Sequence, residues 1–297
     1  MKVLCIDVGG SFLKHTAIED DQKIGRVGSL ATPRDSLESF MRAVKSIYEI
    51  YEGVSGIAVS TPGIVDVEKG FMYTGGSLDY IRNIHMAERI SGMCGGLPVS
   101  VENDAKAAAT AELYAGVLKD VKNGIVLTIG TAIGGTIIID RKILRGNNLF
   151  AGEMSYAIYH DDGVRDERKW NLQKNMWGFR GVPSRIVNLY GDKDLRSEVI
   201  LQRGENGDTK AEEAVRTTAG ETALLVHNLQ CCYDPELIAL GGGISAQPEY
   251  IRMVREELSK INRLFHGVVP MSRVEPCYYF NNANLLGAYF AYRNRRE

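Results

Sequence analysis

A chain of 297 residues exceeds the size at which one hydrophobic core usually keeps growing, so we expect two domains with a cleft between them. With 44% hydrophobic and 24% charged residues the composition is that of a globular protein, and a net charge of −2 gives no support for a nucleic-acid or membrane-surface partner. No apolar run reaches the roughly 18 residues that a membrane-spanning helix needs.

The first predicted element is an apolar strand over residues 2–7, which the chain enters without the basic region and cleavage site of a secretory signal. We therefore predict a cytoplasmic protein. The strand ends in Asp7-Val8-Gly9-Gly10-Ser11, and strand-like alternation resumes over residues 12–18. Two glycines after a strand-terminal Asp favour a tight hairpin with outward-facing amides, to which Ser11 and Lys14 add donors for phosphate. An Asp at this position would suit a hydrated Mg²⁺.

Helix and strand patterns alternate over the next part of the chain. Residues 37–51 and 85–93 are predicted helices, and residues 54–60 are a buried strand that turns at Thr61-Pro62-Gly63. Ligand crevices in open α/β sheets form at such carboxyl ends. The glycine-rich stretch over residues 66–80 is predicted to be a loop, either a substrate loop or a plain connector.

Residues 99–113 place an acid between a strand and a helix. A β-branched run ends in Glu102-Asn103-Asp104, and an alanine-rich helix follows. Two interpretations are open. Asn103 and Asp104 could cap the helix, because Asn and Asp are favoured N-caps, or Asp104 could be a catalytic carboxylate at the mouth of the helix.

Residues 125–140 are predicted to be two apolar strands joined by a turn of glycines and threonines. Such a turn leaves backbone amides bare, and bare amides bind phosphate. The competing interpretation is that Gly134-Gly135 simply makes a hairpin.

The two halves of the chain share the order of strand, glycine-rich hairpin and strand, which suggests a duplicated topology. Glu153 follows a glycine in a segment of little periodicity, and it could bind a pair of sugar hydroxyls or be a solvated loop acid. The buried strand over residues 237–240 leads into Gly241-Gly242-Gly243, which would let the backbone lie flat against a planar ligand such as adenine. Helices are predicted over residues 183–190, 211–233, 248–261 and 283–295.

Cysteine and histidine spacing argues against a structural zinc site. The five cysteines include no CxxC pair, and none of the five histidines has a second His or Cys at metal-ligand spacing. We therefore expect no structural zinc.

Three glycine turns after apolar strands, with an acid ending another strand between them, form a specific combination. On these motifs the chain resembles the ROK family of sugar kinases, repressors and related open reading frames, within the actin-like ATPase superfamily, over essentially its whole length. The matching segments are the first phosphate motif, the catalytic segment, the second phosphate motif and the adenosine motif: residues 7–11 with Lys14, 102–105, 128–135 and 241–244.

The resemblance implies two α/β domains of ribonuclease-H-like type that close over a cleft. The N-terminal domain would cover residues 1–115, joined by the C-terminal helix over residues 283–297, and the C-terminal domain would cover residues 116–282. Because family members commonly form dimers, a homodimer is expected.

The resemblance also implies the chemistry of the site. Asp104 would be the general base that accepts the proton of a sugar 6-hydroxyl as that oxygen attacks the γ-phosphoryl group of ATP. Asp7 would organise Mg²⁺ through water. Asn103 and Glu153 would bind sugar hydroxyls, with Gly75 or Gly76 from the 66–80 loop. The ATP-binding residues would be Asp7, Gly9, Gly10, Ser11, Lys14, Gly130, Thr131, Gly134, Gly135, Gly241, Gly242 and Gly243.

Two departures from the family pattern narrow the expected function. ROK repressors carry an N-terminal helix-turn-helix, for which the sequence leaves no room before Asp7. Most ROK kinases have a GEIGH-like segment followed by a cysteine-rich zinc motif. Here the segment is Gly152-Glu153-Met154-Ser155-Tyr156, with Tyr156 in place of the sugar- and zinc-binding His, and no cysteine lies between Cys94 and Cys231.

These departures, with the Arg165-Asp166 segment, look similar to the family members that phosphorylate cellobiose and related glucosides at O6 of the non-reducing glucose. A zinc-free pocket would leave room at C1 of the glucose for an aglycone. The alternatives are a glucokinase, an N-acetylmannosamine kinase, or a kinase-derived sugar sensor that binds without phosphorylating.

Overall fold

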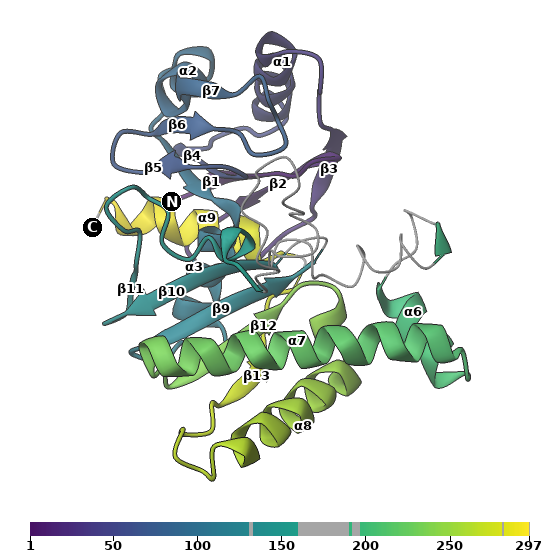
Figure 1. Cartoon of the computed structure of the whole chain (residues 1–297). Coiled ribbons are helices and arrows are strands. Elements are labelled where there is room, and N and C mark those ends of the chain that lie inside the picture. Colours follow the sequence, from purple (N-terminus) through teal and green to yellow (C-terminus); the bar gives the residue numbers. More distant parts are fainter. Residues whose placement is uncertain (131–132, 160–189, 192–196, 281, 297) are drawn as a thin grey trace, which may run out of the picture. The chain divides into compact units, whose positions relative to one another are not determined.

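The computed structural model describes residues 1–130, 133–159, 190–191, 197–280 and 282–296 (Figure 1). The chain divides into two compact units. Unit 1 comprises Met1–Gly116, Arg145–Phe150 and Asn281–Glu297, and unit 2 comprises Val117–Leu144 and Ala151–Phe280. Each unit has a five-stranded sheet and its own hydrophobic core, so the chain has the predicted α/β class.

Unit 1 is built on a sheet with the strand order β3-β2-β1-β4-β8. Its strands are β1 (Val3–Val8), β2 (Phe12–Ile18), β3 (Gly28–Ala31), β4 (Gly56–Thr61) and β8 (Val99–Asn103). β1, β4 and β8 run parallel, while β2 and β3 pair antiparallel at one edge. Every residue of β1 and β4 is buried, as expected for central parallel strands that are covered on both faces.

The helices of unit 1 are α1 (Leu37–Tyr48), α2 (Met86–Met93), α3 (Asp104–Ala115) and α9 (Ala283–Asn294). α1 begins after Ser36, whose hydroxyl oxygen accepts a hydrogen bond from the Ser39 amide at 3.2 Å and so caps the helix. Its apolar face, which includes Phe40 and Val44, is buried in the same core as the strand residue Leu4.

The last helix packs against an early one. α9, yellow in Figure 1, contacts α3 and the strands β1, β4 and β8. The approach to α3 is so close that a Cβ on Gly287 would lie 1.7 Å from the carbonyl oxygen of Ala107. A glycine is therefore required at position 287 for the two helices to meet.

Part of the segment that was predicted to be a loop over residues 66–80 forms strands instead. A three-stranded sheet of order β5-β6-β7 contains β5 (Val65–Asp66), β6 (Phe71–Thr74) and β7 (Arg82–His85). The loop prediction was wrong for β6 because a strand of 4 residues is too short to show a clear alternation.

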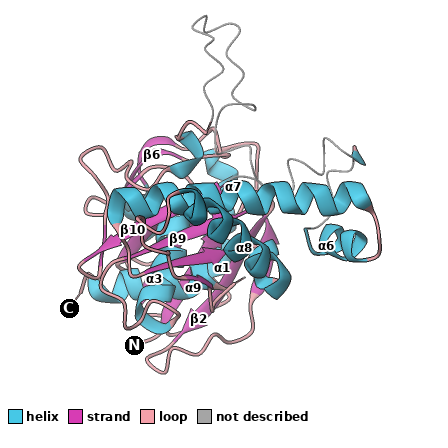
Figure 2. Cartoon of the chain, turned by 60° about the horizontal axis from the view of Figure 1, so that its bottom comes forward, coloured by secondary structure: helices cyan, strands magenta, loops and turns pink. Residues whose placement is uncertain are grey.

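Unit 2 is built on a sheet with the order β11-β10-β9-β12-β13. Its strands are β9 (Gly124–Ile129), β10 (Ile133–Ile139), β11 (Lys142–Ile143), β12 (Leu237–Gly241) and β13 (Val274–Pro276). Its described helices are α6 (Ser197–Glu205), α7 (Thr209–Tyr233) and α8 (Pro248–Leu264), with short 3₁₀ turns η1 (Met154–Tyr156) and η3 (Ile244–Ala246). Figure 2 shows α8 lying beside the long helix α7, which it contacts.

The long periodic segments of unit 2 were predicted correctly. α7 and α8 match the helices predicted over residues 211–233 and 248–261, and α7 begins after Asp208, whose carboxylate accepts hydrogen bonds from the amides of Lys210 and Ala211. The helix predicted over residues 183–190 lies outside the described residues except at its last position. Among the described residues, no helix is both long enough and apolar enough to cross a membrane.

Candidate active site

Three polar residues lie in one row across the parallel strands of unit 1. In the registers of the sheet, Asp7 of β1 pairs with Ser60 of β4, and Ser60 pairs with Glu102 of β8. All three lie close to the carboxyl ends of their strands, and parallel strands present these ends at the same edge of a sheet. The edge where α/β proteins place their ligands is therefore polar in this unit.

Asp7 is held from two directions. Its Oδ1 accepts a hydrogen bond from the Ser60 hydroxyl at 3.1 Å and another from the side-chain amide of Asn284 at 2.9 Å. Burial raises the pKa of the Asp7 carboxyl above its ordinary value, and these two hydrogen bonds and the nearby charge of Lys14 offset part of the rise. A divalent cation would stabilise the ionised carboxylate that burial disfavours, so this group fits a hydrated Mg²⁺.

Asn103 caps α3, which was one of the two interpretations of this segment from the sequence. Its Oδ1 accepts a hydrogen bond from the amide of Lys106 at 3.1 Å, and its side-chain amide donates to the carbonyl of Gly63 at 3.0 Å. Asn103 is buried, and these two bonds fix the orientation of its side chain. Binding of a sugar hydroxyl by Asn103 stays a prediction.

Asp104 is the first residue of α3 rather than its cap. Its Oδ1 accepts a hydrogen bond from the amide of Ala105 at 2.8 Å, and the residue is half-buried. The strand β8 and the capped helix therefore present a carboxylate at the polar edge of unit 1. The position suits a general base, and its catalytic role stays a prediction.

Glu102 and Arg145 form an ion pair that the sequence did not predict. Two nitrogens of the Arg145 guanidinium donate to the two Glu102 carboxylate oxygens at 3.0 and 2.6 Å, and Glu102 also accepts from the amide of Asn103 at 2.8 Å. The Glu102 side chain is only 3% exposed. Burial alone would lower the pKa of Arg145, but its hydrogen bonds to Glu102 and the charge of Glu102 raise it.

The first glycine motif is a hairpin turn between β1 and β2, as predicted. The amide of Gly9 donates to the carbonyl of Phe12 at 3.0 Å, so the prediction of outward-facing amides was wrong for Gly9. The carbonyl of Gly9 accepts from the hydroxyl of Thr32 at 2.7 Å, and the carbonyl of Gly10 accepts from Nε of Arg34 at 3.0 Å. Other parts of unit 1 therefore hold the turn by its carbonyls. Next to these residues, Ser11 is exposed and Lys14 is half-buried.

The predicted substrate loop contacts the turn that follows β4. Gly76 has a φ of +61°, and a Cβ there would lie 2.9 Å from the Cβ of Pro62. A Cβ on Gly63 would lie 2.1 Å from the carbonyl oxygen of Thr74. Gly75 is buried, with only 2.6 Å between a Cβ placed on it and the Cβ of Ile81. These glycines bring the loop against Gly63, the residue that Asn103 also binds.

The second glycine motif differs from its prediction. Gly134 and Gly135 do not form the turn between β9 and β10 but lie inside β10, paired with Thr128 and Leu127 of β9. The prediction placed them in the turn because glycine is frequent in turns and depleted in strands. Gly130 directly follows β9, and Thr131 lies outside the described residues.

Gly135 faces the segment that carries Glu153. A Cβ on Gly135 would lie 2.4 Å from Cγ of Met154 and 2.9 Å from the carbonyl oxygen of Gly152. Gly152 has a φ of +85°, and a Cβ on it would lie 2.8 Å from the carbonyl oxygen of Gly135. The two glycines let β10 approach the backbone of Gly152 and the side chain of Met154, the two neighbours of the half-buried Glu153.

The third glycine motif follows β12, as predicted. Gly241 ends the strand, and Gly242 has a φ of +93° and lies so close to β9 that a Cβ there would be 2.2 Å from the carbonyl oxygen of Ile129. Gly243 is the N-cap of the 3₁₀ turn η3. Packing and turn geometry explain Gly242 in full, so a role in binding adenosine stays a prediction.

The family model named ROK family matches residues 3–168 and 173–294 of this chain. The chain belongs to the ROK family. A curated β-glucoside kinase of Klebsiella pneumoniae is 29% identical over 297 residues, which cover 98% of this chain and 95% of that protein. An N-acetylmannosamine kinase of Vibrio cholerae is 27% identical over 99% of this chain and all of that protein.

A solved structure shows the same fold. A ROK family protein from Streptococcus pneumoniae, determined in complex with sucrose, has a TM-score of 0.85 and 28% identity, and the match covers 100% of this chain and 99% of that chain. The predicted family, the actin-like ATPase fold and the enzyme class of sugar kinase are thereby confirmed.

Two residues of this ROK site could not be found from sequence patterns. Asn284 lies 277 positions from Asp7, and Arg145 lies 43 positions from Glu102. Neither belongs to a glycine motif, and no local pattern indicates either contact. Within the described part of the chain, no group of three or more His, Cys, Asp or Glu residues is arranged to hold a metal ion.

Proposed function

We propose that this protein transfers the γ-phosphoryl group of ATP to the 6-hydroxyl of a glucoside such as cellobiose. The observation that carries the proposal is the placement of Asp104. It directly follows a buried strand and an N-cap whose side chain is fixed by two hydrogen bonds, and it belongs to the same sheet edge as Asp7.

Asp104 acts as the general base. Its carboxylate accepts the proton of the sugar 6-hydroxyl while that oxygen forms a bond to the γ-phosphorus, and the bond from that phosphorus to the β,γ-bridging oxygen of ATP breaks. The products are a sugar 6-phosphate and ADP. Because such reactions depend on positioning and charge, a carboxylate carried by a rigid strand and helix suits the task.

The phosphates of ATP are assigned to the glycine motifs. The turn at Gly9–Ser11, with the Ser11 hydroxyl and Lys14, and the backbone of Gly130–Gly135 would bind them, and Gly241–Gly243 would lie against the adenine. Asp7 would hold Mg²⁺ through water, and the ion would neutralise charge on the phosphate oxygens when bound. Asn103, Glu153 and the Gly75-Gly76 loop would bind sugar hydroxyls.

The preference for a glucoside rests on residue 156 and on the relatives. Tyr156 stands where most ROK kinases have a sugar- and zinc-binding His, and no cysteine-rich motif follows it. The relative from Klebsiella pneumoniae is named a β-glucoside kinase, and the protein from Streptococcus pneumoniae was determined with sucrose. In β-glucosides and in sucrose alike, C1 of the glucose carries a substituent. N-acetylmannosamine is the competing substrate, because the Vibrio cholerae relative is named for it.

A coupled assay of ATP conversion to ADP with Mg²⁺ tests the proposal. The acceptors are cellobiose, gentiobiose, salicin, glucose and N-acetylmannosamine. We expect kcat/KM for the three glucosides to exceed that for glucose. A preference for glucose or N-acetylmannosamine would overturn the glucoside assignment and keep the kinase. Binding without turnover on all five would favour the sugar sensor.

Two further predictions accompany this function. The first is a homodimer, which sedimentation equilibrium of the purified protein would test directly. The second is a division of the chain into two domains, residues 1–115 with 283–297 and residues 116–282. Expression of each part, with its own stability measurement, would test it.

A further inference from the structure

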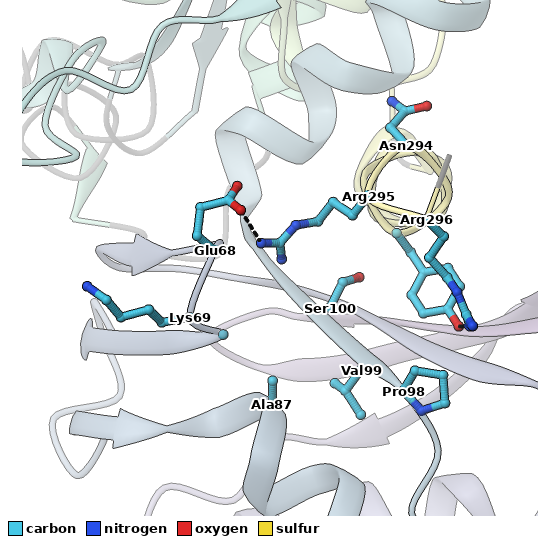
Figure 3. A pocket seen from close by; sticks show the side chains of 11 residues that line it. Glu68, Lys69, Ala87, Pro98, Val99, Ser100, Asn294, Arg295 and Arg296 are labelled. Carbon is cyan, nitrogen blue, oxygen red and sulfur yellow. Dashed lines mark hydrogen bonds and ion pairs between the residues drawn. The ribbon is translucent and has the colours of Figure 1, made fainter.

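Unit 1 contains a cavity that no step of the proposed reaction uses (Figure 3). Its volume is about 630 Å³, which lies within the usual range for small-molecule sites of about 300–1,000 Å³. Pro98, Val99 and Ser100 line it at the start of β8, whereas Asn103 and Asp104 lie at the other end of that strand. The cavity is therefore separate from the candidate active site.

The hydroxyl of an otherwise buried serine lines this cavity. Ser100 is 6% exposed, and within the described part of the chain its side chain has no hydrogen-bond partner. Figure 3 shows Ser100 on β8 next to Arg295 of the segment that ends α9. The hydroxyl is thus open to the cavity and free to donate a hydrogen bond to a ligand that brings an acceptor.

Two arginines flank that hydroxyl. Arg295 contacts Glu68 at 3.4 Å, but the side chain of Glu68 is 85% exposed, so this ion pair contributes little and can be exchanged. Arg296 donates to the hydroxyl of Tyr292 at 2.6 Å and lies over its ring, with 5.6 Å between the guanidinium carbon and the ring centroid. Tyr292 is buried, and it holds Arg296 at the wall of the cavity.

The charges of the lining favour an anion. Lys69 also lines the cavity, but its ammonium is bonded to Asp66 at 2.8 Å and extends away from Ser100 in Figure 3. The remaining charged groups are Arg295, Arg296 and the exposed Glu68. Guanidinium groups bind phosphate through paired hydrogen bonds, and a phosphate monoester would bring close to two negative charges at neutral pH.

We propose that this cavity binds the phosphate group of a small phosphorylated molecule between Arg295, Arg296 and Ser100. The phosphate displaces Glu68 from Arg295 and accepts the hydrogen bond of the Ser100 hydroxyl. Inorganic phosphate and a sugar phosphate share this chemistry, and the experiment separates them. The proposal goes beyond the phosphoryl transfer and does not depend on which sugar is the acceptor.

Isothermal titration of the full chain with inorganic phosphate, glucose 6-phosphate and glucose tests the site. We expect both phosphates to bind at this site and glucose not to bind there. The double variant R295Q/R296Q should weaken this binding about tenfold or more, because it removes two charge-assisted donors. R293Q is the matched control, since Arg293 lies on the same helix but outside the lining, and it should bind as the parent does.

Two more variants keep the result interpretable. K14Q alters the predicted phosphate turn of the kinase site, so phosphate bound there would be lost in K14Q and kept in R295Q/R296Q. S100A removes only the hydroxyl that lines the cavity and serves if the double variant does not fold. Tighter binding of glucose 6-phosphate than of inorganic phosphate would identify a sugar phosphate as the ligand, and the reverse would identify the free ion. Unchanged phosphate affinity in folded R295Q/R296Q, or in S100A when that variant replaces it, would overturn the proposal.

Discussion

The two units carry candidate residues of different kinds. In unit 1 they are mostly side chains at strand ends, and hydrogen bonds hold Asp7, Glu102 and Asn103 in place. In unit 2 they are mostly glycines, and close contact of one backbone with another defines their positions. Gly135 lies against Gly152, and Gly242 lies against Ile129.

This difference separates two ways of building a site. A hydrogen-bonded side chain can be replaced by one of similar shape without moving the backbone, so its chemistry can be removed alone. A glycine at a close backbone contact cannot be replaced without moving the chain, so fold and function should change together. The predictions below test this separation.

The largest effect is expected from Asp104→Asn in unit 1. Asn103 remains the cap of α3 and Asn tolerates the position, so the protein should fold and bind sugar. Loss of the general base should lower kcat by about 10²–10⁴-fold, because a positioned base contributes about that much. Steady-state kinetics with the preferred sugar measures kcat, and urea unfolding measures the free energy of unfolding.

The control for this change is Asp79→Asn, an exposed acid of the same unit outside the sheet edge. It should leave kcat unchanged. If Asp104→Asn also retained near-parental kcat, Asp104 would not be the general base. The only remaining interpretation would be that this segment serves to begin helix α3.

The second effect concerns stability and the Glu102–Arg145 pair. Arg145→Met leaves a carboxylate that is only 3% exposed without its cation, and breaking a buried pair from one side costs about 3–5 kcal/mol. Arg145→Lys keeps the charge but loses the paired geometry, so it should cost less. Urea unfolding of the parent protein, Arg145→Met and Arg145→Lys measures the two losses in the free energy of unfolding.

The matched control lies in unit 2. Arg216 pairs with Glu212 on the surface of α7, where both side chains are nearly half-exposed. Arg216→Met should change the free energy of unfolding by no more than about 0.5 kcal/mol, as for exposed helix pairs. Equal losses in the free energy of unfolding for Arg145→Met and Arg216→Met would show that the Glu102–Arg145 ion pair contributes no more to stability than an exposed pair does.

The sequence predicted those features of this comparison that are local. A strand, two glycines and another strand indicate the β1–β2 hairpin, and the three-glycine run after a buried strand indicates the turn after β12, since both depend on neighbouring residues. The cap of α3 was one of two open interpretations, and the structure confirms it for Asn103. The long helices were predicted because their periods extend over many residues.

The features that sequence patterns missed depend on contacts between distant segments. Asn284 binds Asp7 and Arg145 binds Glu102, and the intervening chain gives no signal of either. The position of Gly134 and Gly135 was wrong for a related reason. Gly135 admits Met154 and the backbone at Gly152, and a local pattern cannot distinguish a glycine that turns from one that makes room.

The third prediction tests the role of backbone contact in unit 2. Gly135→Ala would place a Cβ 2.9 Å from the carbonyl oxygen of Gly152, so the segment that carries Glu153 must shift. We expect a loss of about 1–3 kcal/mol in the free energy of unfolding, as for overpacking, together with a higher KM for the sugar. Urea unfolding and steady-state kinetics on one preparation would show both changes.

Gly220→Ala is the matched control. Gly220 lies within α7, and a Cβ there would meet no atom closer than Cγ of Glu257 at 4.0 Å. Alanine should stabilise that helix by up to about 1 kcal/mol and leave the KM unchanged. A Gly135→Ala protein with parental stability and KM would show that the neighbouring residues can move to admit a Cβ. The close contact at Gly135 would then not determine stability or sugar binding.

The smallest effect is expected next to Gly135. Thr136 of β10 is fully buried, and within the described residues its hydroxyl has no hydrogen-bond partner. If contact rather than hydrogen bonding shapes this part of unit 2, Thr136→Val should stabilise the protein by about 1 kcal/mol, because valine has a similar shape and no unsatisfied hydroxyl. Thr222→Val is the contrasting variant, because its hydroxyl is equally buried but has a hydrogen-bond partner. The hydroxyl of Thr222 lies 2.8 Å from that of Tyr250, so Thr222→Val should cost about 1 kcal/mol in the free energy of unfolding. Opposite signs in urea unfolding would support the interpretation that close contact shapes β10, whereas a loss at both positions would mean that hydrogen bonding also holds β10.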